Sequence, residues 1–541
     1  MSEIQTQIET EPKPGIPVEA VEKKEEDTAY TKRLKEHFGF FGPVTFVYAC
    51  IYAFCTFQND AGMAFPFFIA ASLLFFCFSL SKLEITLKSG SAFYMVSMML
   101  LAVSTFCTDD RRIIIMNKTG IFLLTMSLLL KQFCDTSKWK LQKYFNSIIV
   151  LTFASLANLV RPVTDGKAFY EDKKKAGKVW YIFLGLLIAV PLLAVVLSLL
   201  SSADAVFRNV LRDFLKNINF ANIINVIWRV TFIFFASYML LSYLCEGKIS
   251  DQVKDKRTGE PLIAITITGL LTLIYVFFSV IQIVYLFLGR MQLPEAYTYA
   301  QYAREGFFQL LAVSFLNLII VLVCMGRFRE SRILKGVLIV MSLCSFIMIA
   351  SSAMRMIIYI RYYYMTFLRL FVLWALVLLF AMFVGIVIQI LKEEFPLFRY
   401  GVIVVTVLYM ALSFSHPDYI IAKINVANIE NNPDGSREVS EDDFFQSSYS
   451  YRDFDYLEGL SADAAPVLLA YMDKEGYDFY IDDEGEIRVR ESEGDPSPYS
   501  KTGLEHGYLT HIKIVTESLN IRTFNISRYM ALKQIEKYIE Q

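Results

Sequence analysis

The sequence predicts an all-α polytopic membrane protein, with about 11–12 transmembrane helices and a small α+β soluble carboxy-terminal domain. Composition is the first reason, because 55% of the residues are hydrophobic, only 19% are charged and the mean hydropathy is +0.44. Long apolar stretches are the second, since a helix needs about 20 apolar residues to cross a bilayer core. Continuous runs of this length indicate helices and not the alternating strands of a membrane barrel.

The chain divides into three predicted parts. Residues 1–36 are rich in Glu and Pro and lack an apolar core, so we expect a disordered cytoplasmic arm. Residues 37–416 are expected to form a multi-span transmembrane domain, and residues 417–541 a soluble acidic domain. The apolar stretches lie at 40–57, 64–82, 90–106, 113–131, 144–160, 178–201, 222–245, 261–288, 307–326, 333–359, 367–391 and 398–416.

The number of crossings follows from the basic residues of the loops. If all stretches cross and the amino terminus is inside, the inner loops hold 13 basic residues and the outer loops 19, against the positive-inside rule. Stretch 144–160 is short and contains Ser and Asn, and if it is re-entrant or interfacial the counts become 22 and 10. We therefore expect eleven spans, a cytoplasmic amino terminus and an extracytoplasmic carboxy-terminal domain. In either topology the loops 289–306 and 360–366 share a side with that domain.

The carboxy-terminal part carries its own secondary-structure signals. It holds 25 acidic and 12 basic residues. Ser461-Ala462-Asp463 resembles a helix cap ahead of residues 464–471, and Asn525 or Ser527 is suited to cap a last helix. Alternation at 477–481 and 486–490 around an acidic turn predicts a hairpin.

Catalytic and metal-binding signatures are absent from the sequence. The eight cysteines lie in or beside apolar stretches, where thiols behave as small hydrophobic groups, and they form no CxxC or Cys/His cluster. The four histidines (His37, His416, His506 and His511) are isolated along the chain. We therefore predict no catalytic residue, no cofactor, no metal ion and no nucleic-acid partner, with the lipid bilayer as the principal partner.

An unusual basic and aromatic patch lies at residues 355–369, where no acidic residue occurs between Glu330 and Glu393. One interpretation is an aromatic belt with basic anchors at the membrane surface. The alternative is a site for an anion, an anionic lipid headgroup or the protein's own acidic tail, because guanidinium groups suit phosphate and carboxylate. The candidate residues of that site are Arg355, Arg361, Tyr363, Tyr364 and Arg369.

A second set of residues is a candidate interface or gate. Arg304 and Glu305 end an amphipathic segment that leads into the span containing Asn317. Asp204 follows Ser201-Ser202-Ala203 and is expected to cap an amphipathic surface helix. Acidic residues are absent from the interiors of the predicted spans, which disfavours a pump with a buried carboxylate relay.

Several strings resemble a family of uncharacterised bacterial multi-pass membrane proteins, catalogued as a domain of unknown function of the 4153/4173 type. Tyr363–Arg369 is similar to a family stretch that usually has Gly at its second position, where this chain has Tyr364, so a tight turn is less expected there. The resemblance implies bacterial origin and a cell-membrane location, and it supplies no substrate. The other matching strings are Leu200–Phe207, Arg304–Leu310 with Asn317, and Tyr456–Pro466.

Three functional hypotheses follow. The first is a non-enzymatic, transporter-like or lipid- and anion-binding membrane protein. The second is a sensor or regulatory scaffold whose carboxy-terminal domain binds an envelope component or a partner protein. The third, an enzyme acting on lipid-linked substrates, is the least expected, because the sequence shows no clustered carboxylates or histidines near the membrane surface.

Overall fold

Helices that are long and apolar enough to cross a membrane dominate the structure. The computed structural model describes residues 28–136, 139, 141–172, 177–204, 207–208, 220–249, 257–284, 306–431, 456–475, 478–481, 487–490, 507–517 and 519–539. Nine candidate spans occur in these residues, which confirms a multi-pass helical membrane protein. They are α2 (Phe38–Thr56), α3 (Ala64–Lys82), α5 (Arg111–Phe133), α10 (Phe220–Cys245), α11 (Pro261–Gln282), α13 (Phe307–Arg327), α14 (Arg332–Tyr363), α15 (Phe367–Leu391) and α16 (Leu397–Phe414).

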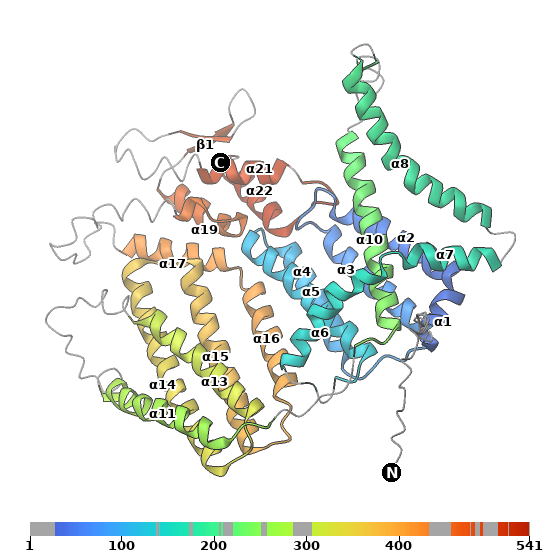
Figure 1. Ribbon diagram of the computed structural model, residues 1–541. Helices are drawn as coiled ribbons and strands as arrows, with labels where there is room; N and C mark the ends of the chain where they lie inside the picture. The colour runs from blue at the N-terminus through green and yellow to red at the C-terminus, as the bar shows by residue number, and fades with distance from the viewer. Residues whose placement is uncertain are drawn as a thin grey trace, which may run out of the picture.

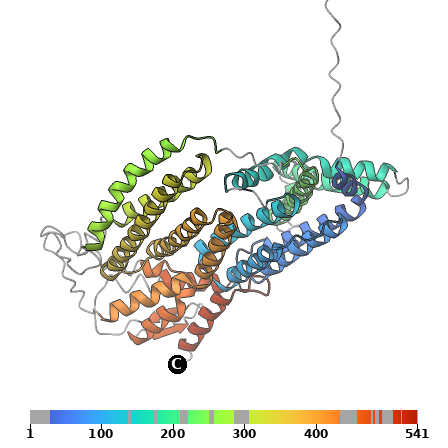
Figure 2. The ribbon, with the colours of Figure 1, turned by 90° about the horizontal axis from the view of Figure 1, so that it is seen from below.

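The remaining predicted stretches also correspond to helices. Two are α4 (Ser91–Cys107), with 17 residues, and α8 (Gly177–Ala203), which continues past Pro191. The third is a pair bent by 49°, formed by α6 (Leu141–Ala154) with η1 (Ser155–Asn158) and by α7 (Arg161–Asp172). Every apolar stretch of the sequence therefore overlaps a helix. The helices form two groups with α16 between them, as Figures 1 and 2 show.

One end of the bundle, which we call the α1 end, gathers the helix α1 (Ala29–Glu36) and several loops. Thr28 donates a hydrogen bond to the carbonyl of Cys245, and Arg33 lies 2.6 Å from Glu84. The backbone of Gly259 is hydrogen-bonded to that of Arg327 at 3.0 Å, so the loop before α11 meets the loop after α13. Residues 29–36 were predicted to be disordered, and this was wrong, because Thr31 and Leu34 are buried against the bundle. Residues 1–27 of that arm lie outside the described residues.

The opposite end, which we call the α17 end, meets the carboxy-terminal region. The backbone N–H of Met63 donates to the carbonyl of Phe524 at 2.7 Å, and that of Asp109 donates to the Asp463 carboxylate at 2.9 Å. Met365 exchanges two hydrogen bonds with the side chain of Asn425. The loop 360–366 therefore contacts the carboxy-terminal region, in agreement with the prediction that the two lie on the same side of the membrane. Loop 289–306 lies outside the described residues except for Gly306.

The α6–η1–α7 segment begins and ends near the α1 end. The ring of Tyr144 is centred 4.4 Å from that of Phe398, at the start of α16. Asn158 donates to Ser242, near the end of α10, at 3.2 Å, and Arg161 lies 2.8 Å from Glu246. Because both ends of the segment lie at one end of the bundle, it does not connect the two ends. These contacts place both ends of stretch 144–160 at the α1 end, and the re-entrant or interfacial path of the eleven-span topology stays a prediction.

The carboxy-terminal region is mainly helical. Its predicted hairpin is present, with Asp478 paired to Arg490 and Ile481 to Ile487. This two-stranded ribbon is the sole sheet of the described residues, so the predicted α+β domain is not supported. The elements are α17 (Pro417–Asn431), η3 (Ala462–Ala464), α19 (Ala465–Lys474), β1 (Asp478–Ile481), β2 (Ile487–Arg490), α21 (Leu509–Glu517) and α22 (Ile526–Ile539).

The core of this region is continuous with the membrane helices. Leu457, Leu468 and Tyr508 are fully buried in a cluster that also includes Met365. Side chains of α15, including Phe367 and Leu370, pack against the same cluster. In Figure 1, α17, α19, α21 and α22 lie across the ends of α15, α16 and α4. The region therefore covers the helix ends and does not hang from them as a separate tail.

Candidate functional site

Four buried aspartates meet where the carboxy-terminal region covers the helix ends. Asp109 and Asp110 lie between α4 and α5, Asp418 lies in the first turn of α17, and Asp463 lies in η3. Their exposed fractions are 7%, 2%, 1% and 6%. Burying a carboxylate is costly unless it is hydrogen-bonded or paired with a cation. Each of these carboxylates is therefore expected to have hydrogen-bond donors or cations as partners.

Asp463 joins three segments of the chain. Its carboxylate accepts a hydrogen bond from the hydroxyl of Thr108 and one from the backbone N–H of Asp109. It also accepts from the hydroxyl of Ser527, at the start of α22. Ser461 occupies the predicted N-cap position, but its side chain makes no capping hydrogen bond. The Asp463 side chain does not cap the helix either, because it binds the other elements named above.

Asp109 is held from the carboxy-terminal side. Its carboxylate accepts from Arg528 Nε at 2.6 Å and from the backbone N–H of Ala462 at 3.3 Å. His511 Nε2 lies 3.7 Å from its Oδ2. Burial opposes the charge of Asp109, but its contacts with His511 and Arg528 prevail and lower the pKa of its carboxyl.

Arg112 bridges the other two aspartates. Its guanidinium donates two hydrogen bonds to Asp110, at 2.9 and 3.0 Å, and a third to Asp418. The same group lies 4.1 Å from the centre of the Phe367 ring, in cation–π geometry. Burial and the neighbouring charge of Asp110 raise the pKa of Asp418, although Arg112 opposes the shift. One arginine thus connects α5 to α17 and α15.

His416 completes the network from the turn before α17. Its Nδ1 lies 3.3 Å from Asp463 Oδ2, and its backbone φ is +49°, in the left-handed region. The contact with Asp463 raises the pKa of His416 above its ordinary value, against the effect of burial. His416 is isolated in the sequence, and the structure gives it a carboxylate partner.

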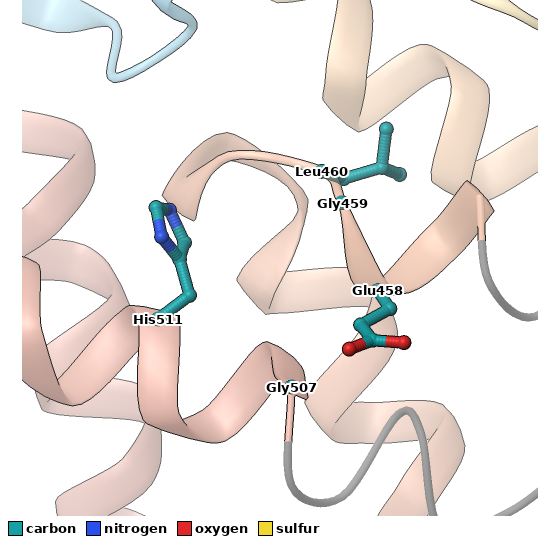
Figure 3. A pocket seen from close by; sticks show the side chains of 5 residues that line it. All are labelled: Glu458, Gly459, Leu460, Gly507 and His511. Atoms are coloured by element: carbon teal, nitrogen blue, oxygen red, sulfur yellow. The ribbon is translucent and has the colours of Figure 1, made fainter.

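A surface pocket of about 410 Å³ borders this network, and its lining residues are shown in Figure 3. Glu458 and His511 supply its polar side chains, and Leu460 supplies an apolar wall. A Cβ at Gly507 would clash with the Glu458 carboxylate, so glycine leaves room for that group. His511 faces both the pocket and Asp109, so it links the pocket to the α4–α5 loop.

The predicted arginine–tyrosine patch is only partly assembled. Arg369 stacks 4.3 Å from the centre of the Tyr359 ring and donates to the carbonyl of Tyr364. Arg355 is 8% exposed and packs against Gly306, whereas Arg361 is exposed. Tyr363 ends α14, and its side chain lies outside the described structure. The described contacts of the patch therefore join Arg369 to Tyr359 and Tyr364.

Tyr364 itself occupies a glycine-like conformation, with φ +65° and ψ 170°. The expectation that Tyr at this position argues against a tight turn was wrong. The chain turns sharply between α14 and α15 with the Tyr side chain present. The carbonyl of Tyr364 is held there by Arg369.

Two of the four predicted interface residues, Asp204 and Asn317, lie in the described part of the chain. Asp204 accepts a hydrogen bond from the backbone N–H of Phe207 at 2.8 Å, as a cap does, and the rest of the expected surface helix lies outside the described residues apart from Arg208. Asn317 is fully buried and donates to Ser345 at 3.1 Å. Arg304 and Glu305 lie outside the described residues.

Sequence reasoning missed the aspartate network. The prediction that no carboxylates or histidines cluster near the ends of the spans was wrong. A local signal existed in Thr108-Asp109-Asp110-Arg111-Arg112, a charged turn between two apolar stretches, but its partners lie more than 300 residues away. In the described part of the chain, no group of three or more acidic, histidine or cysteine side chains is arranged to hold a metal ion.

The helices and their docked carboxy-terminal region define a multi-pass integral membrane protein with a cap on one end of its bundle. The profile of the family described as a domain of unknown function (DUF4153) matches residues 95–471, more than two thirds of the chain. The chain belongs to this family. No curated protein and no solved structure matches the chain.

Proposed function

We propose that this protein is a non-enzymatic sensor or regulatory scaffold of the bacterial cell envelope. In this proposal the carboxy-terminal region is a cap that binds an envelope component or a partner protein and passes that event to the membrane helices. The class is the second of the hypotheses that the sequence left open.

The single observation that carries the proposal is the shared position of His511. One side of its imidazole lines the pocket beside Glu458, and Nε2 lies 3.7 Å from Asp109. A ligand that binds His511 competes with Asp109 for it. The loss of that contact changes the interactions of the α4–α5 loop, because Asp109 belongs to this loop. The backbone N–H of Asp109 also donates a hydrogen bond to Asp463. Occupancy of the pocket and the packing of the cap are therefore coupled energetically.

The charge of the two ends supports an outward-facing cap. Basic residues such as Arg33, Lys88, Arg257 and Lys335 lie at the α1 end, where the positive-inside rule places the cytoplasm. The acidic cap lies at the other end. A cap on the outer side of the membrane would be exposed to envelope components and could bind one of them.

Anion or lipid-headgroup binding at Arg355, Arg361 and Arg369 remains a weaker proposal. Arg369 is engaged by Tyr359 and Tyr364, and Arg355 is buried, so only Arg361 offers an exposed guanidinium. If the wild type and Arg361→Gln retain the same amount of anionic lipid, this second proposal is contradicted.

A photo-crosslinking residue placed at Gly459, the exposed rim of the pocket, tests the proposal in intact cells. We expect a discrete adduct that Glu458→Gln abolishes. The control position is Tyr529, which is 41% exposed on α22 and does not line the pocket. Adducts of equal yield from both positions, or an adduct that Glu458→Gln leaves unchanged, would contradict a ligand site here.

A further inference from the structure

Basic side chains from three segments of the chain gather around Gly90 at the α1 end. Gly90 precedes α4 with a φ of +79°, and a Cβ on it would lie 2.6 Å from Lys131 Nζ and 3.7 Å from Arg399 Nη2. Lys131 belongs to the last turn of α5, and Arg399 to the first turn of α16. Lys88, in the loop before α4, donates from Nζ to the carbonyl of Cys134 at 2.9 Å. Three positive charges therefore share one small region.

No described acidic side chain pairs with Lys131 or Arg399. The charges that act on Lys131 are those of Arg399 and Lys88, which have the same sign. Basic residues of the same end that do have an acidic partner are Arg33 with Glu84, Arg161 with Glu246, and Lys335 with Glu393. The positive-inside rule explains why basic residues lie at this end, but it does not explain why these three converge without a counter-ion.

The cationic groups of Lys131 and Arg399 are available to a ligand. Lys131 is half-buried and Arg399 is exposed, and among the described residues neither side chain donates a hydrogen bond. Like charges that lie close together repel each other, and an anion between them removes this cost. Phosphate oxygens suit both groups, because they accept charge-assisted hydrogen bonds from ammonium and guanidinium. The cluster therefore has the chemistry of a phosphate site.

Aromatic rings indicate the depth of this cluster in the membrane. Lys131 Nζ lies 5.4 Å from the centre of the Tyr94 ring. The ring of Phe398, next to Arg399, is centred 4.4 Å from that of Tyr144. Tyrosine and basic residues at the ends of spanning helices are typical of the membrane–water interface. We therefore place the cluster at the level of the phospholipid headgroups.

An exposed apolar face of α16 continues from Arg399 into the membrane. Ile403 and Val407 follow Arg399 at four-residue intervals, so the three side chains lie along one side of the helix. Ile403 is 39% exposed and Val407 is 47% exposed. A phospholipid whose phosphate binds Arg399 would place an acyl chain along this face. Free phosphate would make no use of it, so the face favours a lipid as the source of the phosphate.

We propose that Lys88, Lys131 and Arg399 form a binding site for the phosphate group of an anionic phospholipid. Basic pockets between spanning helices are a known way of binding such headgroups. The bound lipid would join α5 to α16, which lies between the two helix groups (Figure 1), and would stabilise their packing. This site is at the opposite end of the bundle from the pocket of the cap and does not depend on the proposed function.

Lipid titration of the full chain in detergent, followed by native mass spectrometry, tests the proposal. The probes are phosphatidylglycerol, phosphatidylcholine with the same acyl chains, and inorganic phosphate. The test variant is Lys131→Gln with Arg399→Gln. The matched control, Arg33→Gln with Lys335→Gln, also removes two positive charges of the α1 end, but these two are already paired with carboxylates.

We expect the wild type and the control to bind phosphatidylglycerol about tenfold more tightly than the test variant. Phosphatidylcholine should bind all three proteins with the same, weaker affinity. Equal affinities of the test variant and the control for phosphatidylglycerol would overturn the proposal. If inorganic phosphate binds the wild type as tightly as phosphatidylglycerol does, the assignment to a lipid is wrong.

Thermal unfolding separates a loss of binding from a failure to fold. Without added lipid, the test variant should have a Tm at least equal to that of the wild type, because the substitutions remove a repulsion and break no ion pair among the described residues. Phosphatidylglycerol should raise the Tm of the wild type and leave that of the test variant unchanged. An equal rise in both proteins would also contradict the site.

Discussion

Tyr364 has a backbone conformation that conflicts with its side chain. A residue at φ +65° and ψ 170° lies in a region that is essentially restricted to glycine, at a cost of about 1–3 kcal/mol. The conformation is maintained because Arg369 binds the Tyr364 carbonyl and Asn425 binds both backbone groups of Met365. The turn is thus over-determined by its neighbours.

Tyr364→Gly is expected to raise the free energy of unfolding by about 1 kcal/mol, because the relief of strain exceeds the entropy that glycine adds to the unfolded chain. Thermal unfolding in detergent measures the change. Tyr363→Gly, inside the last turn of α14, is the matched control and should be destabilising by about 0.5–1 kcal/mol. A loss of stability in both variants would show that Tyr364 is not strained.

His416 gives the docking of the cap a predicted pH dependence. Asp463 raises the pKa of His416 in the folded state, so the contribution of this pair is complete below the ordinary histidine pKa of about 6.5. That contribution is lost as pH rises through the raised pKa. Other charged or titratable groups facing this contact are Asp109, Asp110, Asp418, Arg112, His511 and Arg528.

Protease sensitivity of the cap should therefore increase between about pH 6 and the alkaline range. His416→Asn tests this, because Asn tolerates the left-handed backbone at φ +49° but does not titrate. The variant should show no such increase. An unchanged pH profile in His416→Asn would assign the dependence to another group.

At the scale of elements, docking rests on a few segments that meet at Asp463. This carboxylate fixes η3 to the α4–α5 loop and to α22. Arg112 fixes α5 to α17, and the backbone of Met365 fixes the α14–α15 turn to α17. The cap is therefore attached through loops at the helix ends as well as through its apolar core.

Asp463→Ala should destabilise the docked cap by about 3 kcal/mol or more, because it leaves several buried donors without an acceptor. Limited proteolysis would then release a carboxy-terminal fragment sooner, while the membrane helices remain folded. Asp473→Asn, an exposed carboxylate on the neighbouring α19, is the control and should behave as the wild type. Identical digestion of Asp463→Ala and Asp473→Asn would exclude this role of the aspartate.

At the scale of the whole molecule, the contacts constrain the topology. Loops 57–63, 108–110 and 364–366 meet the cap, whereas Leu83, Cys134, Glu246 and Gly259 lie at the α1 end. With the α6–α7 segment returning to its own end, an odd number of crossings separates α1 from the cap. Eleven crossings satisfy both these contacts and the positive-inside rule.

Labelling in intact cells tests the orientation. In a background without native cysteines, Ile521→Cys in the cap should react with a membrane-impermeant maleimide, since Ile521 is 90% exposed. Glu84→Cys at the α1 end, where the side chain is 70% exposed, should react only after the cells are permeabilised. The reverse pattern would invert the proposed orientation.

Much of the fold is readable from local sequence. Each apolar stretch predicted a helix, because lipid forces long apolar segments to pair their backbone internally. The weakness of stretch 144–160 was visible in its length and in Ser147, Ser155 and Asn158, and in the structure this segment belongs to a helix pair bent by 49°. Asp204 was recognised as a cap because capping depends on residues three positions apart.

The sequence by itself determined which segments enter the membrane and which end is basic, because both depend on composition over short windows. Only the tertiary structure decided that the acidic tail docks as a cap and that Asp109, Asp418 and Asp463 are buried together. The physical reason is that pairing of buried charges depends on residues hundreds of positions apart. Their proximity is produced by packing and leaves no periodic signal along the chain.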